Sequence, residues 1–434
     1  MSAAPAATRA PRVLLLAPDD APTPDDPGGA AALLRSRVDL LLACGAQVDL
    51  LQLRDPARPG RLADFMAARP DAWRALRDRL ADHDVLELPR PRRARAPLRH
   101  ALRTARDPLA LVADLALETR RRFDAALAGR RADLLWAEQL VPATWLAGWA
   151  QRTGDRRPRV WGHYDWYSRI KSLRASGRLD PRRWLRHAQI ERGETALLQR
   201  FDALVSGSAS EAEDARGRGA HRALWLPLTH PIGAEPRVPM PADAPAPRVV
   251  HLGGMATTAT RRGLARFLDV TWPRVVALCA RRDQAPPPLW VIGSLRGADA
   301  DLRRRLDAVD AHCPGFVPDL DTALRPGDVH VAPWEHDTGT RTRVPRALAR
   351  GQALVALDVV RRGVPVLVDG ANVALAADLR SMADALVDLL DDPARRLRLA
   401  RAGRDTFRRT FTVDAARPHL AALLRDFLPH DDLR

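Results

Sequence analysis

The sequence predicts an α/β protein of two domains, and three observations carry this prediction. The chain has 434 residues, more than a single ordinary core supports. Short apolar runs alternate with helical patterns along its whole length, as in parallel sheets joined by crossover helices. A proline-rich stretch at residues 229–247 interrupts this alternation and indicates an extended connector.

The first domain opens with a strand, a helix and a second strand. The run Val13 to Ala17 fits a strand buried on both faces, and Gln47 to Leu53 fits the next one. Between them, a loop rich in Pro and Asp carries Gly28 and Gly29 at a helix start. Further strands are expected at residues 84–89, 132–138, 157–166, 201–208 and 222–228.

The same order restarts after the connector, with strands expected at residues 248–255, 288–294, 314–319 and 328–334. The last helix begins at Asp414. We expect a first domain over residues 1–235, a linker over 236–247, a second domain over 248–415, and a terminal helix over 416–434 that packs back on the first domain. This organisation predicts two Rossmann-like domains that face a cleft.

Composition narrows the class of protein. Hydrophobic residues make up 46% of the chain and charged residues 28%, which is typical of a folded soluble protein. No apolar run is long enough to cross a bilayer, and VLLLA near the N-terminus is too short for a signal peptide. We therefore expect a cytoplasmic protein. Cys44, Cys279 and Cys313 have neither metal-ligand spacing nor the pattern of a disulfide framework.

The formal net charge of +16 favours anionic partners, and Lys171 is the single lysine among 69 basic residues. Nucleic acid is disfavoured because the chain has no zinc-finger or RRM-type signature and few Tyr or Phe. The basic run at residues 92–106 is most simply a solvated helix face. Alternatively, it rests on anionic lipid and brings the protein to the inner face of a membrane.

Residues 329–370 predict a buried strand, a glycine-bearing turn, a helix, a second strand and a third short strand. The turn holds Thr338, Gly339 and Thr340. The helix is expected to start with Arg341 and Arg343. Unpaired N–H groups at a helix start attract anions, and arginines add charged donors. The sequence thus predicts a phosphate-bearing ligand at the C-terminal edge of a sheet.

Few histidines and aspartates of the sequence stand in patterns that indicate catalysis or metal binding. His163 ends an apolar strand in WGHYDW with Asp165 beside it, which makes the pair a candidate for proton transfer or ligand contact. The letters DLD at residues 319–321 match a metal-binding motif, but they precede a helical turn where capping aspartates are expected. The sequence therefore predicts no metal site.

Five stretches resemble the GT-B glycosyltransferases of group 1, a family-4-like group that uses nucleotide sugars. They are DDPGGAAALLRSR, VWGHYDW, IERGETALLQRFDALVSGSASEAE, VHLGGMATTATRRGLARFLDVTWPRV and GTRTRVPRALARGQALVA. The resemblance implies a donor bound mainly by the second domain, an acceptor bound mainly by the first, transfer with retention, and no metal or other cofactor.

The resemblance also assigns residues. It places His163, with Asp165, beside the reacting sugar. It places the donor diphosphate against a glycine-rich set with basic neighbours: Gly28, Gly29, Gly253, Gly254, Gly339, Thr340, Arg341 and Arg343.

The chain departs from the family signature at three positions. Arg343 replaces a lysine and keeps the charge, whereas Arg346 replaces the glutamate that grips the donor ribose and Thr338 replaces the other paired acid. Arginine has no hydrogen-bond acceptor, so it cannot make the same ribose contact. Glu335 and Asp337 are nearby acidic candidates for holding the nucleoside or sugar, together with Thr338 and Arg346.

Three functions remain open at this point. The first is an active transferase that acts on a carbohydrate, lipid-linked or small-molecule acceptor. The second is a degenerate GT-B protein that binds another transferase, as Arg346 suggests. The third is a sugar-nucleotide epimerase on the same fold, which the histidine loop and the long basic helices fit poorly.

Overall fold

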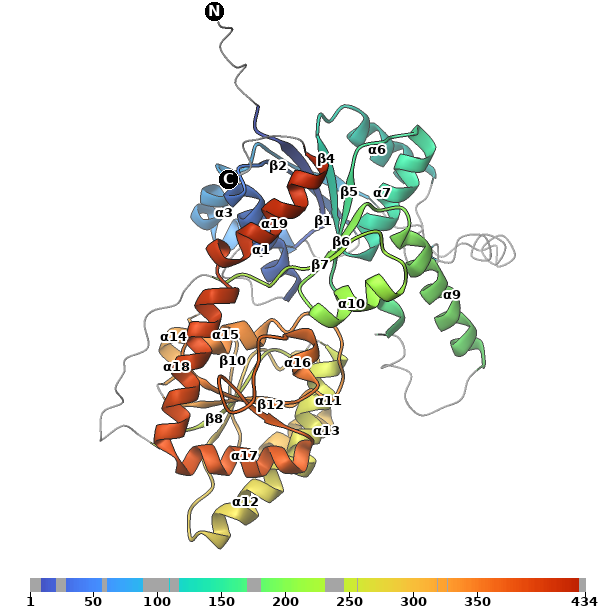
Figure 1. Cartoon of the computed structure of the whole chain (residues 1–434). Helices are drawn as coiled ribbons and strands as arrows, with labels where there is room; N and C mark the ends of the chain where they lie inside the picture. Colours follow the sequence, from blue (N-terminus) through green and yellow to red (C-terminus); the bar gives the residue numbers. More distant parts are fainter. Residues whose placement is uncertain are drawn as a thin grey trace, which may run out of the picture. The chain divides into compact units, whose positions relative to one another are not determined.

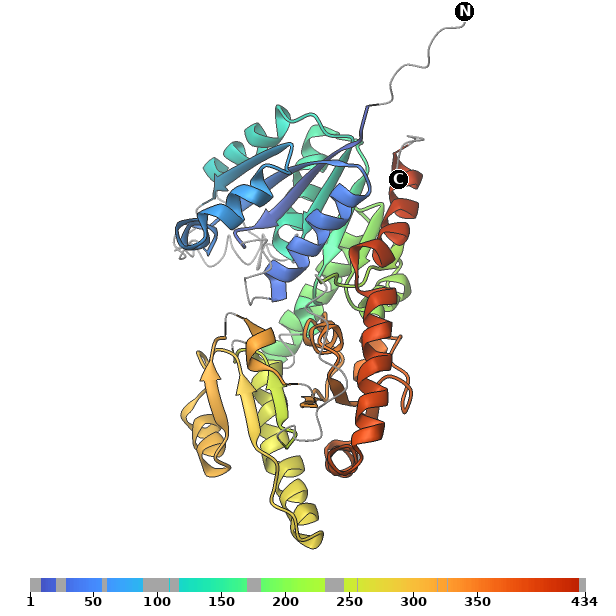
Figure 2. The ribbon, with the colours of Figure 1, turned by 90° about the vertical axis from the view of Figure 1, so that its left-hand side faces the viewer.

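The computed structural model describes residues 9–20, 29–56, 61–88, 109, 117–169, 181–230, 246–255, 257–317, 319–325 and 327–428. The chain divides into two compact units: Met1–Pro227 with Ala416–Arg434, and Leu228–Ala415. Each unit contains one parallel sheet with helices packed against it (Figures 1 and 2). The predicted α/β fold with two sheets is confirmed.

In the described part of the first unit, seven parallel strands lie in the order β3-β2-β1-β4-β5-β6-β7. Their bounds are β1 (Arg12–Pro18), β2 (Gln47–Arg54), β3 (Asp82–Glu87), β4 (Leu134–Glu138), β5 (Arg159–His163), β6 (Ala203–Ser206) and β7 (Ala223–Trp225). The helices are α1 (Gly29–Ala43), α2 (Arg61–Ala68), α3 (Pro70–Arg77), α6 (Leu117–Ala128), α7 (Leu140–Thr153), α9 (Pro181–Leu198) and α10 (Ala209–Gly217).

The described strands of the second unit form a six-stranded sheet in the order β10-β9-β8-β11-β12-β13. They are β8 (Val249–Leu252), β9 (Leu289–Ile292), β10 (His312–Gly315), β11 (Val329–Ala332), β12 (Ala353–Leu357) and β13 (Ala374–Ala376). The helices are α11 (Thr258–Arg266), the π-helical turn η1 (Phe267–Thr271), α12 (Trp272–Arg281), α13 (Ala300–Ala308), α14 (Leu320–Ala323), α15 (Arg343–Ala349), α16 (Val360–Gly363), α17 (Leu379–Asp391) and α18 (Pro393–Thr410).

The last helix, α19 (Val413–Phe427), returns the chain to the first unit. Its Arg417 carbonyl accepts a hydrogen bond of 3.8 Å from the Cys44 thiol just after α1. Asp426 pairs with Arg222 next to β7, and that guanidinium lies over the Phe427 ring. These contacts attach the C-terminal helix to both α1 and the β7 end of the sheet.

The strands are apolar throughout because both faces of each sheet are covered. In β12, Val355 and Leu357 join a cluster with α12 and α17, whereas Leu354 and Ala356 join one with α15 and α18. This is why the sequence shows continuous apolar runs rather than alternation. A buried ion pair, Arg248 with Asp328 at 2.5 Å, ties the chain together just before β8 and β11.

Two predicted strands differ from the structure. The strand expected at residues 314–319 is β10, which begins at His312 and ends at Gly315. The third short strand expected within residues 329–370 is β13, at Ala374–Ala376. In its place the chain turns, because the Asn372 side chain bonds the backbone of Val366 and Val368 at 2.8 Å each.

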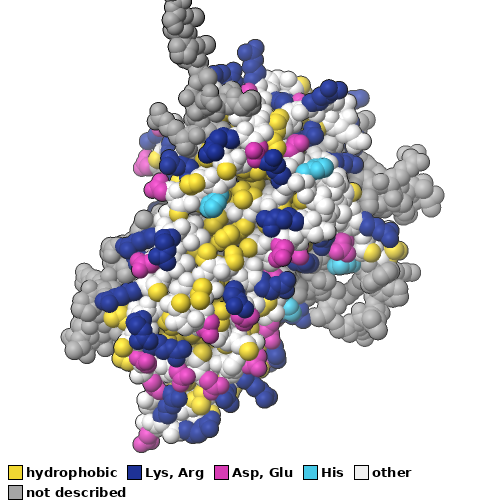
Figure 3. All heavy atoms as spheres, in the orientation of Figure 1, with side chains coloured by type: hydrophobic (Ala, Val, Ile, Leu, Met, Phe, Trp, Pro, Cys, Tyr) yellow, Lys and Arg dark blue, Asp and Glu magenta, His cyan; other side chains and the backbone are white. Residues whose placement is uncertain are grey.

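The surface mixes both signs of charge. On the face in Figure 3, Lys and Arg side chains are interspersed with Asp and Glu. Exposed pairs such as Arg274 with Asp384, at 2.8 Å, compensate part of the positive charge but add little stability. The basic run at residues 92–106 lies outside the described residues. Within the described ranges, no helix is both long enough and apolar enough to cross a membrane.

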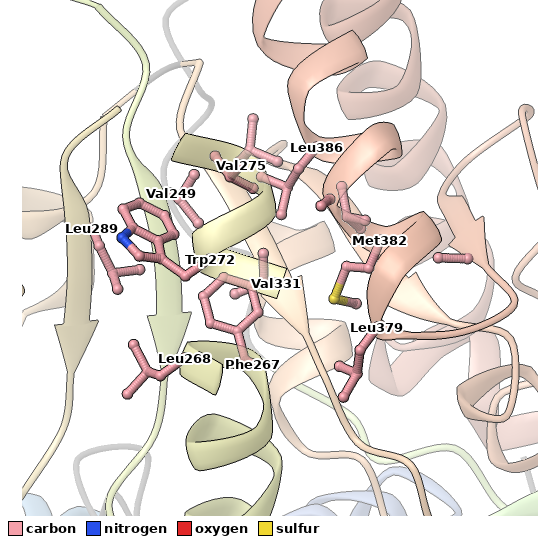
Figure 4. Packing of buried hydrophobic residues seen from close by; sticks show 14 of the residues in the cluster. Val249, Phe267, Leu268, Trp272, Val275, Leu289, Val331, Leu379, Met382 and Leu386 are labelled. Carbon is pink, nitrogen blue, oxygen red and sulfur yellow. The ribbon is translucent and has the colours of Figure 1, made fainter. Parts of the chain in front are cut away.

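Two neighbouring valines on α12 test the core shown in Figure 4, where Val275 packs near Leu386 and Trp272. Val275 is 0% exposed and Val276 is 38% exposed. Val275→Ala removes buried methyl groups and leaves a cavity, so it should lower the free energy of unfolding by about 2 kcal/mol. Hydrogen exchange of the α12 and α17 amides in urea measures this change. Val276→Ala is the control, and equal effects of both changes would contradict the packing.

Candidate functional site

The candidate donor site lies at the C-terminal edge of the second unit's sheet. The chain leaves β8 toward β9 on one side and later returns to β11 on the other side. Such a switch in strand order is where open α/β sheets bind ligands. The loop after β8 carries Gly253 and Gly254, and the loop after β11 runs from Pro333 to Thr342.

Gly253 lets an arginine approach the backbone closely. Its φ is +120°, and a Cβ at this position would overlap the guanidinium of Arg343. Gly293, after β9, has φ +144°, and a Cβ there would overlap the backbone of Gly253 and Gly254. Gly253 and Gly293 therefore allow the loops after β8 and β9 to pack closely against each other and against the guanidinium of Arg343.

Arg343 is the central cation of this site. Its Nη2 donates a 2.8 Å hydrogen bond to Thr260 Oγ1 on α11, and its guanidinium carbon lies 5.3 Å from the centre of the Trp334 ring. Burial, together with like-charge repulsion from Arg346 and Arg341, lowers the pKa of Arg343 to about 9. Within the described part of the chain Arg343 makes no ion pair, so a bound anion would relieve this unfavourable charge.

Arg341 and Arg343 do not both start the helix. The first helical residue is Arg343, and Arg341 lies in the preceding turn, where it donates to the His336 carbonyl and lies 5.4 Å from the Trp334 ring. The turn is tight because Gly339 has φ +64°. The Thr340 hydroxyl in the same turn is buried and has no hydrogen-bond partner in the described structure, so it is available to a ligand.

The nucleoside candidates lie around the same loop but differ in setting. Glu335 is exposed and pairs with Arg266 at 3.3 Å. The Asp337 side chain is 10% exposed, with a carboxylate oxygen 3.5 Å from Arg362 Nε. Thr338, between Asp337 and the glycine turn, is partly buried. Glu335, Asp337 and Thr338 therefore lie together in the loop between β11 and α15.

Arg346 lies one helical turn beyond Arg343, near His230. Burial lowers the pKa of His230 to about 3, and Arg346 and Arg350 contribute to the decrease. His230 is therefore a neutral contact of this helix rather than a second cation.

In the first unit, Gly29 is the first residue of α1, and Gly28 lies outside the described residues. His163 ends β5 and is 1% exposed, and Asp165 follows in a partly buried loop. Burial lowers the pKa of His163 to about 3, with Arg218 and Arg169 contributing, so the imidazole is neutral. His163 and Asp165 therefore belong to the first unit, and the residues around Arg343 belong to the second.

Sequence reasoning missed the carboxylate beside His163. It is Glu211 on α10, whose Oε2 lies 3.7 Å from His163 Nδ1. The sequence would have indicated this carboxylate only with the strand order in hand. Because β5 pairs with β6, a residue shortly after β6 lies near the end of β5.

A second buried pair was also missed. Glu138 ends β4 and lies 3.5 Å from Arg37 on α1, and both side chains are 0% exposed. Burial raises the pKa of Glu138 and lowers the pKa of Arg37. The carboxylate lies directly over Gly162, where a Cβ would overlap it, and Trp136 donates to it at 2.7 Å.

No group of three metal-ligating side chains is present within the described ranges.

The comparison with protein families matches a part of the second unit. Residues 246–392 match the family described as Glycosyl transferases group 1. A search of curated protein sequences finds no match. The fold is similar to sucrose-phosphate synthase from Thermosynechococcus elongatus, with a TM-score of 0.64 and 16% identity over 96% of this chain and 99% of that one.

Two further solved structures have the same fold. HepE from Anabaena, in complex with UDP and glucose, has a TM-score of 0.60 and 15% identity, covering 96% of this chain and 99% of its own. A putative UDP-N-acetylglucosamine 2-epimerase from Listeria monocytogenes has a TM-score of 0.56 and 12% identity, covering 98% and 99%. These likenesses define a protein of the GT-B fold. Within that fold, residues 246–392 of the second unit form a domain that matches the Glycosyl transferases group 1 family.

Gly253→Ala tests the close approach of Arg343. The added Cβ would displace the guanidinium, so we expect nucleotide affinity to fall about tenfold or more, as for loss of a hydrogen bond to a charged group. Gly370→Ala is the control, because φ is +70° there but nothing lies within 4 Å of its Cβ position. Titration calorimetry with UDP measures both variants, and an equal loss in both would show that backbone strain alone is responsible.

Proposed function

We propose that the protein transfers a sugar from a nucleotide diphosphate sugar to a hydroxyl-bearing acceptor. The observation that carries this proposal is Arg343, a desolvated cation without an ion-pair partner in the described structure, held against Gly253 at the switch point of the second sheet. HepE, which has the same fold, was solved with UDP and glucose. This makes UDP the first nucleotide to test.

Cleavage of the donor leaves negative charge on a diphosphate, and that charge must be stabilised as the bond to the anomeric carbon breaks. Hydrogen-bond donors that are already in position stabilise this developing charge efficiently in a site of low polarity. In our proposal, Arg343 and Arg341 supply cationic donors, and the backbone at Gly253, Gly254 and Gly339 together with the Thr340 hydroxyl surrounds the phosphates. The nucleoside lies near Glu335, Asp337, Thr338 and Arg346.

Calorimetric titration with UDP, GDP and ADP tests the donor site. We expect one nucleotide to bind, and Arg343→Ala to weaken that binding about 10- to 100-fold, because a hydrogen bond to a charged group contributes about 1.5–3 kcal/mol. Arg274→Ala, at a surface pair on α12, is the matched control. Absence of binding by all three nucleotides, or equal losses in both variants, would contradict the proposal.

The resemblance to group 1 enzymes further supports retention of configuration and catalysis by side chains without a metal ion. We expect NMR of the product to show the same anomeric configuration as the donor. Excess EDTA should leave the initial rate unchanged. Inversion, or loss of activity in EDTA that Mg²⁺ restores, would refute the corresponding half of this prediction.

The acceptor is a carbohydrate, a lipid-linked sugar or a small metabolite. The net charge of +16 favours an acceptor presented at an anionic membrane. Flotation of the full-length protein with phosphatidylserine vesicles at low salt tests this localisation. Protein that stays at the bottom of the gradient would remove the reason to expect a membrane-bound acceptor.

Arg346 supports a second candidate function, a degenerate protein that binds another transferase. Nucleotide binding without release of UDP from any UDP-sugar, even by slow hydrolysis, would favour this reading. Formation of a free epimer without an acceptor would instead indicate a sugar-nucleotide epimerase.

A further inference from the structure

Two arginines of the candidate donor site share one aromatic ring. The ring belongs to Trp334, in the loop after β11, and its centre lies 5.4 Å from the guanidinium carbon of Arg341 and 5.3 Å from that of Arg343. A guanidinium within about 6 Å of an aromatic centre is attracted by the negative face of the ring, most strongly when the ring is tryptophan. Trp334 therefore attracts the cation in the turn before α15 and the cation that begins this helix.

The ring of Trp334 has little room to move. It is 6% exposed and packs in one apolar cluster with Val344 and Leu348 of α15. On another side, α11 approaches through Gly263, where a Cβ would lie 2.8 Å from the Pro333 carbonyl oxygen and 3.2 Å from Trp334 Cδ1. The two helices therefore hold the ring in place, and a fixed ring can fix the groups that it attracts.

The attraction to the ring opposes a repulsion between the two arginines. Both guanidinium groups are cations, and Arg341 is among the causes that lower the pKa of Arg343. Each arginine also has a contact of its own: Arg341 donates to the His336 carbonyl, and Arg343 donates to Thr260 Oγ1 at 2.8 Å. These hydrogen bonds restrain each arginine separately, whereas the Trp334 ring is a contact that both share.

We propose that Trp334 is a positioning residue that holds Arg341 and Arg343 together before a ligand arrives, so that they bind two linked phosphates of one ligand. The proposal rests on the proposed function, in which that ligand is the diphosphate of a nucleotide sugar. Side chains that are already ordered lose less entropy on binding. A diphosphate offers one charged group to each guanidinium, whereas a single phosphate gains less from the second cation. Trp334 therefore favours diphosphates over monophosphates.

Calorimetric titration of the full-length protein with inorganic pyrophosphate and with orthophosphate tests this role. Trp334→Leu keeps an apolar side chain but removes the aromatic face, so pyrophosphate binding should weaken about 3- to 30-fold. Orthophosphate binding should change little. Trp334→Phe keeps a ring with a weaker attraction for cations, and its affinity for pyrophosphate should lie between those of the wild type and Trp334→Leu.

Trp272→Leu is the matched control, because it also removes a buried tryptophan from the second unit. Trp272 is 4% exposed, and its ring centre lies 6.0 Å from that of Phe267. This change should leave both affinities as they are in the wild type. Equal losses in Trp334→Leu and Trp272→Leu, or equal losses for the two ions in Trp334→Leu, would overturn the proposal.

Arg341→Ala keeps the tryptophan and removes one of the two cations, so it tests the pair without a change in the core. It should weaken pyrophosphate binding more than orthophosphate binding. Equal losses for the two ions in this variant would overturn the proposal even if Trp334→Leu does not fold.

Titration with UDP distinguishes the role of Trp334 from the proposed function. We expect Trp334→Leu to weaken UDP and pyrophosphate binding by similar factors. A selective loss of pyrophosphate binding in a protein that does not bind UDP would support the role of Trp334 and contradict the nucleotide-sugar function. UDP binding that Trp334→Leu leaves unchanged would support the nucleotide site and refute the role of Trp334. Absence of binding by both pyrophosphate and UDP would refute both.

Discussion

The arrangement of the second unit depends on one close contact, the guanidinium of Arg343 lying against Gly253. Only a residue without Cβ allows this contact. Gly293, just after β9, likewise leaves room for the backbone of Gly253 and Gly254. Thr260 then holds the guanidinium from α11, and Trp334 packs beside it. Three loops that are far apart in the sequence thus converge on a desolvated cation. A folded protein tolerates such a group where a ligand of opposite charge compensates it.

Buried ionisable groups at the corresponding edge of the first unit's sheet are arranged differently. There the buried cation Arg37 has a carboxylate, Glu138, within 3.5 Å, and the buried imidazole of His163 is neutral and lies beside Glu211. Arg37 thus has a carboxylate beside it and His163 is uncharged, whereas Arg343 has no ion-pair partner among the residues that the structure describes. In the function proposed above, the donor diphosphate provides the negative charge that compensates Arg343.

The sequence predicted the strands well because both sheets are covered on both faces, which leaves apolar runs such as Leu14 to Leu16 that nothing else explains. It also identified the turn at Gly339 and the basic residues beside it. It failed where a role depends on pairing across strands. Glu211 follows β6 and Glu138 ends β4, and only the strand order brings them to His163 and Arg37. The helix start was misplaced by two residues, since Arg341 turns back to the His336 carbonyl instead of joining α15.

The position of Arg346, three residues after Arg343, affects the charge of the site. Residues three apart on a helix lie on the same side, and the repulsion between these two is among the causes that lower the pKa of Arg343. A glutamate at position 346 would have neutralised Arg343 and would itself have offered an acceptor to a ribose. The arginine does the opposite: it removes the acceptor and increases the positive potential around the donor loop. Arginine at this position therefore replaces an anionic hydrogen-bond acceptor with a cation that attracts negative charge. In the function proposed above, recognition of the nucleoside then depends on other groups of the loop between β11 and α15, where the Asp337 carboxylate is more enclosed than that of Glu335.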